Sequence, residues 1–418
     1  MLPLRPDSFT LDQFTPVFTR LRTRRDGRSE LMHVQGCDRI FWRGGHTALG
    51  WGSPLGKLHK DGLRVLETVG FEEVERGSPR LPAFFWCTRR AADFPAMGDR
   101  LPLIRPLPQS CTSALDDKLR CARLLNAAGF VKDRLAPETF VSLSAMCHEL
   151  RQRARSTEAE DGRLYFLKHR LGVKGQAVTP LRERALLDWL EVQPRREGDF
   201  VVQREVPPAL SRDGHKFVMR CHVLVACRVS APPAAWLHGD VIVLTHAVPY
   251  SHDADNKAAH ISQCGRHHPP PKLLSELGNE HPGASPGLPP RLQYLVSRTI
   301  AAAAPDLIPE ERCPRATLYS LMGFDVALDA HGSPQLLEVN AYPAIADGTM
   351  SKVPSSVYTR LVRDVVSLLV LPALEGVAPV AGGFISLPDA FKTHVATVVG
   401  GAWSGGRQCT GTGDGTGQ

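Results

Sequence analysis

Two short apolar segments near the end of the chain, residues 323–328 and 336–343, carry oxygen-bearing side chains in a spacing that suits a metal ion. We expect these segments to pair as a β-hairpin across an intervening turn. Because side chains alternate along a strand, Glu338 and Asn340 share one face, and a suitable register brings Asp325 to that face. Carboxylate and amide oxygens on rigid strands suit Mg²⁺ that also binds nucleotide phosphates. The alternative is a solvated hairpin face in which Asn340 starts a turn.

A basic loop earlier in the chain could bind those phosphates. Lys168 ends a predicted strand at 164–167, and Lys174 and Gly175 follow in the next loop. Ammonium groups and backbone N–H groups can converge on a phosphate there, and glycine lets the backbone approach closely. A solvated basic turn between two strands has the same pattern, so this interpretation depends on the hairpin that accompanies it.

A strand between the loop and the hairpin contains Gln203, Arg204 and Val206, and it could present backbone N–H and C=O groups to an adenine edge. Lys216 and Arg220 follow at the start of the next predicted strand, on one face. They could hold a γ-phosphate or an acyl-phosphate, so they are the candidate catalytic residues. The alternative is that both are ordinary charges on a solvated β face.

The apolar periodicity predicts the elements that must position these residues. Helices are expected at 116–128, 144–154, 181–190, 292–304 and 355–371, and strands at 164–167, 200–203, 217–225 and in the hairpin. This mixture predicts an α+β fold. A chain of 418 residues is longer than one hydrophobic core usually serves, so we expect two or three lobes around a cleft.

The composition, with 43% hydrophobic and 22% charged residues, is that of a soluble globular protein, and no apolar run is long enough to span a membrane. The ten cysteines form no CxxC pair, which favours reduced thiols in the cytosol. A net charge of +7 is compatible with an acidic partner. The His-rich stretch near Cys264 fits no zinc template, and the aromatic residues are expected in the core, so neither zinc nor a specific nucleic acid is predicted.

Taken in order, six sequence blocks resemble the tubulin tyrosine ligase-like family. The blocks are Lys168 with Lys174-Gly175, Gln203-Arg204, Lys216-Phe217 with Arg220, Asn256-Lys257 with His260, Gly323-Phe324-Asp325, and Leu337-Glu338-Val339-Asn340 with Pro343. The resemblance covers roughly residues 105–372, and Asp117-Lys118 also looks like the family's basic helix start. Residues 1–105 match only weakly.

The resemblance implies an ATP-grasp fold, in which two α+β lobes enclose ATP and Mg²⁺. It implies phosphate contacts at Lys168, Lys174 and Gly175, and an adenine linker from Gln203 to Val206. Lys216 and Arg220 would contact nucleotide or substrate, and Asp325, Glu338 and Asn340 would bind the metal, with Asn340 also serving the cofactor. The expected organisation is an N-terminal α/β lobe at 1–105, a ligase domain at 106–375, and a Gly-rich, mostly disordered tail at 376–418.

The implied activity is ATP-dependent addition of Glu, Gly or Tyr to a protein carboxylate or C-terminus. The partners would be ATP, a free amino acid and an acidic protein such as a tubulin tail, with no membrane, in the cytoplasm or at the cytoskeleton or a cilium.

Three positions depart from the family pattern. Val218 replaces an Asp, Gln263 replaces an Asn, and residues 237–249 lack an expected Arg. The alternatives are therefore an impaired module that binds acidic tails, or another ATP-grasp peptide ligase.

Overall fold

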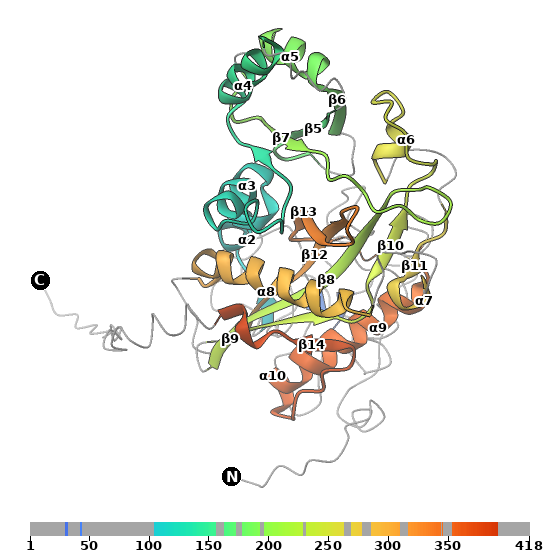
Figure 1. Cartoon of the computed structure of the whole chain (residues 1–418). Helices are drawn as coiled ribbons and strands as arrows, with labels where there is room; N and C mark the ends of the chain where they lie inside the picture. Colours follow the sequence, from blue (N-terminus) through green and yellow to red (C-terminus); the bar gives the residue numbers. More distant parts are fainter. Residues whose placement is uncertain are drawn as a thin grey trace, which may run out of the picture.

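The structure is a computed structural model, and it is described here for part of the chain. The described residues are 30–31, 42–43, 104–155, 163–172, 178–192, 196–228, 231–262, 269–277, 286–309, 317–343, 345 and 353–391. Figure 1 shows two α+β lobes, with helices α2 (Gln109–Asp116) and α3 (Lys118–Ala127) beside their junction. This arrangement agrees with the α+β class predicted from the sequence.

The smaller lobe is a four-stranded antiparallel sheet in the order β4-β7-β5-β6, with two helices packed against it. Its elements are β4 (Thr139–Phe140), α4 (Leu143–Arg155), β5 (Leu164–His169), β6 (Val178–Arg182), α5 (Glu183–Val192) and β7 (Phe200–Arg204). Met146, Tyr165 and Leu186 belong to the core between sheet and helices. Because side chains alternate along β5, Phe166 and Lys168 lie on the other face of this sheet.

The larger lobe is built on an eight-stranded sheet with two long central strands. These strands, β8 (Phe217–Arg228) and β12 (Thr317–Leu328), pair antiparallel. The edge of β12 that faces away from β8 pairs with β13 (Pro334–Asn340) and β3 (Ile104–Pro106). The edge of β8 that faces away from β12 pairs with β9 (Ala231–His238) and β10 (Ile242–Thr245). The sheet is completed by β11 (Lys272–Leu273) and β14 (Phe384–Ser386).

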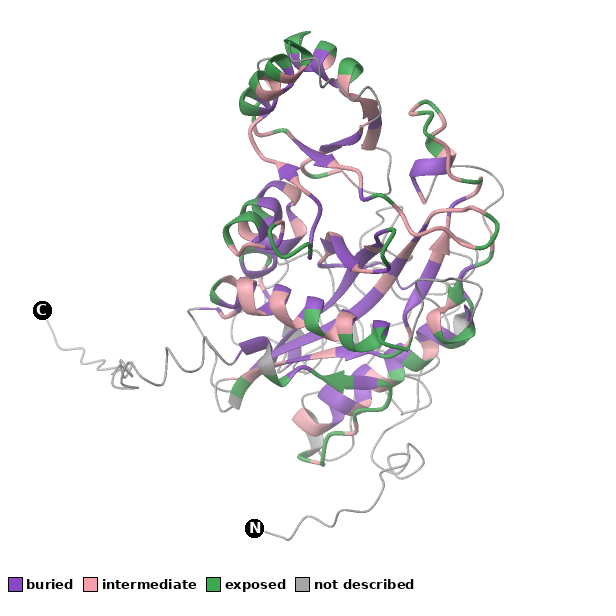
Figure 2. Ribbon diagram, viewed as in Figure 1, coloured by how far each residue is buried: buried purple, intermediate pink, exposed green. Residues whose placement is uncertain are grey.

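Helices pack on both faces of the larger sheet, which explains why its strands are apolar on both sides (Figure 2). One face packs against α8 (Leu288–Leu307). The other packs against α9 (Ser355–Val365), a π-helical segment (Val366–Val370) and α10 (Leu371–Glu375). On strands this apolar, a buried charge such as Asp325, with 7% of its surface exposed, needs a specific explanation.

Short elements complete the described part of the chain. They are β1 (Glu30–Leu31), β2 (Trp42–Arg43), α6 (Lys257–His260), α7 (Leu274–Leu277) and the 3-10 helix Pro388–Phe391. Most of the predicted N-terminal lobe at 1–105 lies outside the described residues. Among the described helices, none combines the length and apolar character needed to cross a membrane.

The predicted helices are present, with shifted ends. The helix predicted at 181–190 is α5, which begins at Glu183 because Leu181 and Arg182 belong to β6. The helix predicted at 355–371 is continued through the π-helical segment and α10 as far as Glu375. Gly376 then takes a left-handed conformation, with φ of 68°, that ends the helix.

The predicted disordered tail at 376–418 needs correction over its first part. Within this segment β14 pairs with β9, and Phe384 and Leu387 are buried. The N–H of Gly383 also donates to Asp364 at 2.8 Å. Residues 384–391 include apolar side chains that pack against the larger lobe, and pairing with a sheet edge satisfies the backbone of this segment. The Gly-rich composition of the later tail does not extend to this segment. Residues 392–418 lie outside the described residues.

Candidate active site

The hairpin of β12 and β13 places three oxygen-bearing side chains on one face. Asp325 lies opposite Glu338, and Gly323 lies opposite Asn340. The amide of Asn340 donates to Oδ2 of Asp325 at 3.4 Å. A bulge after Asp325 shifts the pairing beyond that residue, but it leaves the three side chains together. The hairpin therefore has the register on which the predicted convergence depended.

Arg220 of β8 binds Asp325 through both arms of its guanidinium group. Nε donates to Oδ1 at 2.6 Å, and Nη2 donates to Oδ2 at 2.7 Å. The two residues are cross-strand partners, so the sheet register holds this pair in place. Burial alone would lower the pKa of Arg220, but the charge of Asp325 and its hydrogen bonds raise it above the ordinary value. Arg220 is therefore a fixed cation in the site.

Gly323 makes room for that arginine. A Cβ atom at Gly323 would lie 3.1 Å from Cδ of Arg220 and 3.0 Å from Cβ of Pro343. Both distances are shorter than ordinary van der Waals contacts. A side chain at this position would therefore press against the stem of Arg220.

Glu338 is paired with a lysine that the sequence interpretation did not place in the site. Nζ of Lys118 lies 3.4 Å from Oε2 of Glu338 and donates to the carbonyl of Gly172 at 2.7 Å. Burial would raise the pKa of Glu338, but Lys118, Lys168 and Arg220 together hold it below its ordinary value. Glu338 is therefore held in its ionised form.

The N-terminus of α3 delivers Lys118 to this position. Asp117 caps the helix by accepting hydrogen bonds from the N–H groups of Leu119 and Arg120. Asp117 also accepts from Nε of Arg170, in the loop after β5, at 2.5 Å. An Asp before an amphipathic helix is a recognisable N-cap signal, and it could have marked the neighbouring Lys118 as fixed in space.

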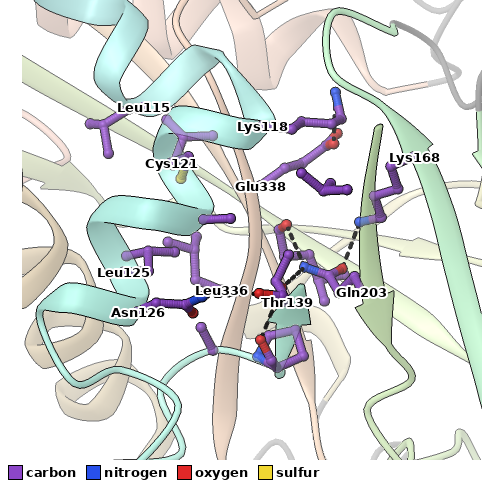
Figure 3. Close-up of a pocket in the computed structure, with 16 residues that line it drawn as sticks. Leu115, Lys118, Cys121, Leu125, Asn126, Thr139, Lys168, Gln203, Leu336 and Glu338 are labelled. Carbon is purple, nitrogen blue, oxygen red and sulfur yellow. Dashed lines mark hydrogen bonds and ion pairs between the residues drawn. The ribbon is translucent and has the colours of Figure 1, made fainter. Parts of the chain in front are cut away.

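Lys168 and Gln203 join the smaller lobe to the hairpin, as Figure 3 shows. Nζ of Lys168 donates to Oε1 of Gln203 at 2.6 Å. The amide nitrogen of Gln203 lies 3.2 Å from the hydroxyl of Thr139 and 3.3 Å from the carbonyl of Leu337. Burial lowers the pKa of Lys168 below its ordinary value. Gln203 therefore contributes an interaction between lobes through its side chain.

Lys168, Gln203 and Thr139 also line a cavity of about 30 Å³ between α3 and the two sheets (Figure 3). A cavity of this size can hold a water molecule. Cys121 lines it, and burial raises the pKa of this thiol to about 12. Cys121 is therefore unsuited to act as a nucleophile.

Lys216 has a different partner from the one its predicted role requires. Its Nζ donates to Oε1 of Glu205 at 2.8 Å, and the hydroxyl of Tyr250 donates to Oε2 at 3.0 Å. Val218 lies on the same side of the strand as Lys216 and stands where the family pattern has an Asp. Glu205 therefore supplies Lys216 with the carboxylate that Val218 lacks. Burial raises the pKa of Tyr250 above its ordinary value, and Glu205 adds to this shift. Sequence alternation could not reveal this pairing, because Glu205 follows β7 and reaches Lys216 across a loop.

The other predicted positions are distributed around this centre. Val206 is buried, whereas the side chain of Arg204 is half-exposed and lies 3.6 Å from Glu138. Lys174 and Gly175 lie outside the described residues. The same is true of Gln263 and of the histidines and cysteine in the zinc alternative, apart from His260, which is buried in α6.

The charges at the junction suit a polyphosphate with a hard metal ion. The carboxylates of Asp325 and Glu338 meet the cations of Lys118, Lys168 and Arg220, so positive charge is in excess. No group of three His, Cys, Asp or Glu residues forms a metal cluster in the described ranges. Two carboxylates with the amide oxygen of Asn340 fit Mg²⁺, which keeps positions for water and phosphate oxygens.

Comparison with known families identifies the group of proteins to which this chain belongs. The model of the tubulin-tyrosine ligase family matches residues 106–264 and 282–376, which is more than half of the chain. The family consists of ATP-dependent ligases that add an amino acid to a protein. The comparison with curated proteins finds no match. The charged junction between the two lobes lies within the matched residues, and the chain belongs to the tubulin-tyrosine ligase family.

Proposed function

We propose that this protein uses ATP and Mg²⁺ to join Glu, Gly or Tyr to a protein carboxylate or C-terminus. The observation that carries the proposal is the meeting of Asp325 and Glu338 with Lys118, Lys168 and Arg220 where the lobes adjoin. A carboxylate oxygen would attack the γ-phosphorus and release ADP. The amine would then form the amide bond as phosphate leaves and a proton is lost. Both steps build negative charge that positioned cations stabilise.

The metal ligands would be Asp325, Glu338 and Asn340. Bound Mg²⁺ would neutralise charge on the phosphates. Lys168 is aligned by Gln203, and Arg220 is aligned by Asp325, so both cations are held before substrate arrives. Such preorganisation lowers the reorganisation needed during phosphoryl transfer. Lys174 and Gly175 remain proposed phosphate contacts on the basis of the sequence.

The adenine linker would be the segment from Gln203 to Val206. The N–H of Arg204 already donates to the carbonyl of Glu138, and the N–H of Glu205 donates to that of Leu164. These two N–H groups are therefore already engaged. The backbone of Val206, the next residue of the linker, is the candidate group for hydrogen bonding to the adenine edge.

Tubulin is the proposed protein substrate. The net charge of +7 favours association with an acidic tail, because opposite charges increase the encounter rate. The proposed partners are ATP, a free amino acid and a tubulin C-terminal tail, and the proposed location is the cytoplasm, at the cytoskeleton or a cilium.

A second candidate function is a module that binds acidic tails without transferring an amino acid. Val218 and the absence of an Arg from 237–249 favour this alternative, as does the engagement of Lys216 by Glu205. The intact group of Asp325, Glu338 and Asn340 favours activity, so catalysis is the preferred proposal.

The first test is thermal unfolding of the full chain with Mg²⁺ and ATP. A ligand at about 100 times its Kd should stabilise the folded state by roughly 2.7 kcal/mol. The protein is then incubated with labelled Glu, Gly or Tyr and tubulin, with tail-cleaved tubulin as the control. Incorporation that requires ATP and the tail supports the proposal. Stabilisation by tubulin tails without incorporation supports the binding module, and no response to Mg-ATP would contradict the ligase assignment.

A further inference from the structure

The ammonium group of Lys216 lies in a pocket of four side chains, which we call the cation box: Phe166, Glu205, Tyr250 and His260. Besides the 2.8 Å contact with Glu205, Nζ lies 5.3 Å from the ring centroid of Phe166 and 5.4 Å from that of Tyr250. A carboxylate and two aromatic faces are the groups that recognise alkylammonium ions in proteins. The cation box is therefore a built ammonium site.

His260 contributes an acceptor that has no hydrogen-bond partner among the described residues. Its Nε2 lies 2.9 Å from the carbonyl of Asp253, so the ring donates there and Nδ1 carries a lone pair. Nδ1 is buried and lies 3.9 Å from Oε1 of Glu205, beyond hydrogen-bond distance. Two acceptors that face each other across this gap are satisfied by a donor placed between them.

The four side chains of the cation box come from outside the segment that carries Lys216, although backbone hydrogen bonds join that segment to the loop of Tyr250. Phe166 belongs to β5, Glu205 follows β7, Tyr250 follows β10, and His260 ends α6. Ring contacts of His260 with Phe166 and Tyr250 hold these elements together. Lysine carries its charge on a flexible four-carbon stem, so the ammonium group can leave while the box remains assembled.

Departure of Lys216 would leave an unpaired carboxylate in a part-buried site, which is energetically unfavourable. In the proposed ligase Lys216 contacts the nucleotide phosphates, and another cation must then occupy the box. The reaction itself supplies one, because its second substrate carries an ammonium group.

We infer that the cation box binds the ammonium group of the incoming amino acid, and that Lys216 fills it until a nucleotide is bound. This inference rests on the proposed function and assigns a site to its amine substrate. Binding of nucleotide and amine would then be cooperative, because the phosphates draw Lys216 out of the box.

The first arm of the test uses ethylammonium chloride as the probe and the melting temperature as the readout. Lys216→Ala empties the box, and ethylammonium should raise the melting temperature of this variant by roughly 3 to 6 °C at ten times its Kd, relative to equal NaCl. Lys257→Ala, in the exposed part of α6, should show no such rise. Absence of the rise in Lys216→Ala would overturn the inference.

The second arm uses the wild-type chain and so does not depend on a variant that folds. Ethylammonium or glycine should stabilise the wild type only when Mg²⁺ and a non-hydrolysable ATP analogue are present, and Glu205→Gln should lose this response. If nucleotide stabilises the wild type but the amine adds nothing, the box only anchors Lys216. That result would overturn this inference and leave the proposed function standing. Failure of the nucleotide to stabilise the protein would instead overturn the proposed function.

Discussion

The β12–β13 hairpin and the cation box both hold carboxylates at the lobe junction, but they hold them in different ways. Asp325 and Glu338 are cross-strand partners, so backbone register determines their separation. Glu205 lies just beyond the end of β7 and is held by the side chains of Lys216 and Tyr250, and no strand pairing determines these distances. The hairpin is therefore a stiff site that keeps its geometry when its ligand leaves. In the cation box, side-chain contacts hold the carboxylate, and its cation is carried on a flexible lysine stem, which makes the box suited to an exchangeable ligand.

The largest effect on ligand affinity is expected from removing the negative charge of Glu338 in the hairpin. Glu338→Gln removes a proposed metal ligand but keeps the shape of the side chain, and we expect Mg-nucleotide affinity to fall by about 100-fold or more. Titration calorimetry with Mg²⁺ and an ATP analogue measures this change. Glu191→Gln, an exposed carboxylate in α5, is the matched control and should bind normally. Unchanged affinity in Glu338→Gln would remove the hairpin from the proposed site.

Gly323→Ala tests whether the hairpin is too rigid to accommodate one added methyl group without loss of stability. The added Cβ would press on Arg220 and Pro343, and overpacking of this kind costs about 1–3 kcal/mol in the free energy of unfolding. Urea unfolding measures the loss. In combination with Arg220→Ala, part of the contact disappears, so the two costs should not add. Strict additivity would show that Gly323 does not position Arg220.

His222, a buried residue two positions after Arg220 on β8, gives the hairpin side of the junction a pH dependence. Burial, with help from Arg220, lowers the pKa of His222 to about 3 from the ordinary value of 6.5. The unfolded chain gains a proton below pH 6.5 while the folded chain does not, so stability is full above that pH and falls as the pH decreases toward 3. Within this range the free energy of unfolding falls by roughly 1 kcal/mol for each unit by which the pH decreases.

Urea unfolding at pH 7 and pH 5 measures the contribution of His222. His222→Phe keeps a ring near Tyr358, and we expect it to show a smaller loss of stability between these pH values. His148→Gln, at an exposed position in α4, should retain the wild-type dependence. An equal dependence in wild type and His222→Phe would assign the effect to other groups.

The smallest effect is expected at Arg204, which lies in the linker but outside both charged sites. Its side chain is half-exposed, and its contact with Glu138 is 3.6 Å. Arg204→Ala should change the free energy of unfolding by less than about 1 kcal/mol and leave nucleotide affinity close to that of the wild type. A large loss of affinity would mean that the side chain of Arg204, and not only its backbone, contacts the nucleotide.

Most of the fold that surrounds the site was predictable from local pattern. The hairpin, the strand before Lys168 and the helices of both lobes follow from apolar periodicity and turn residues. The ends of α5 were less predictable, because Leu181 and Arg182 fit a helical pattern but pair with β5. The segment around β14 was placed in the tail because its pairing with β9 leaves little trace in composition.

The sequence by itself determined the family and the common face of Glu338 and Asn340, because strand alternation is a local property. Only the tertiary structure decided which cation each carboxylate meets. Lys118 reaches Glu338 because capping by Asp117 positions the start of α3, and Lys216 meets Glu205 because two lobes pack together. Such pairings depend on how separate elements approach one another in space, and spacing along the chain does not specify that approach.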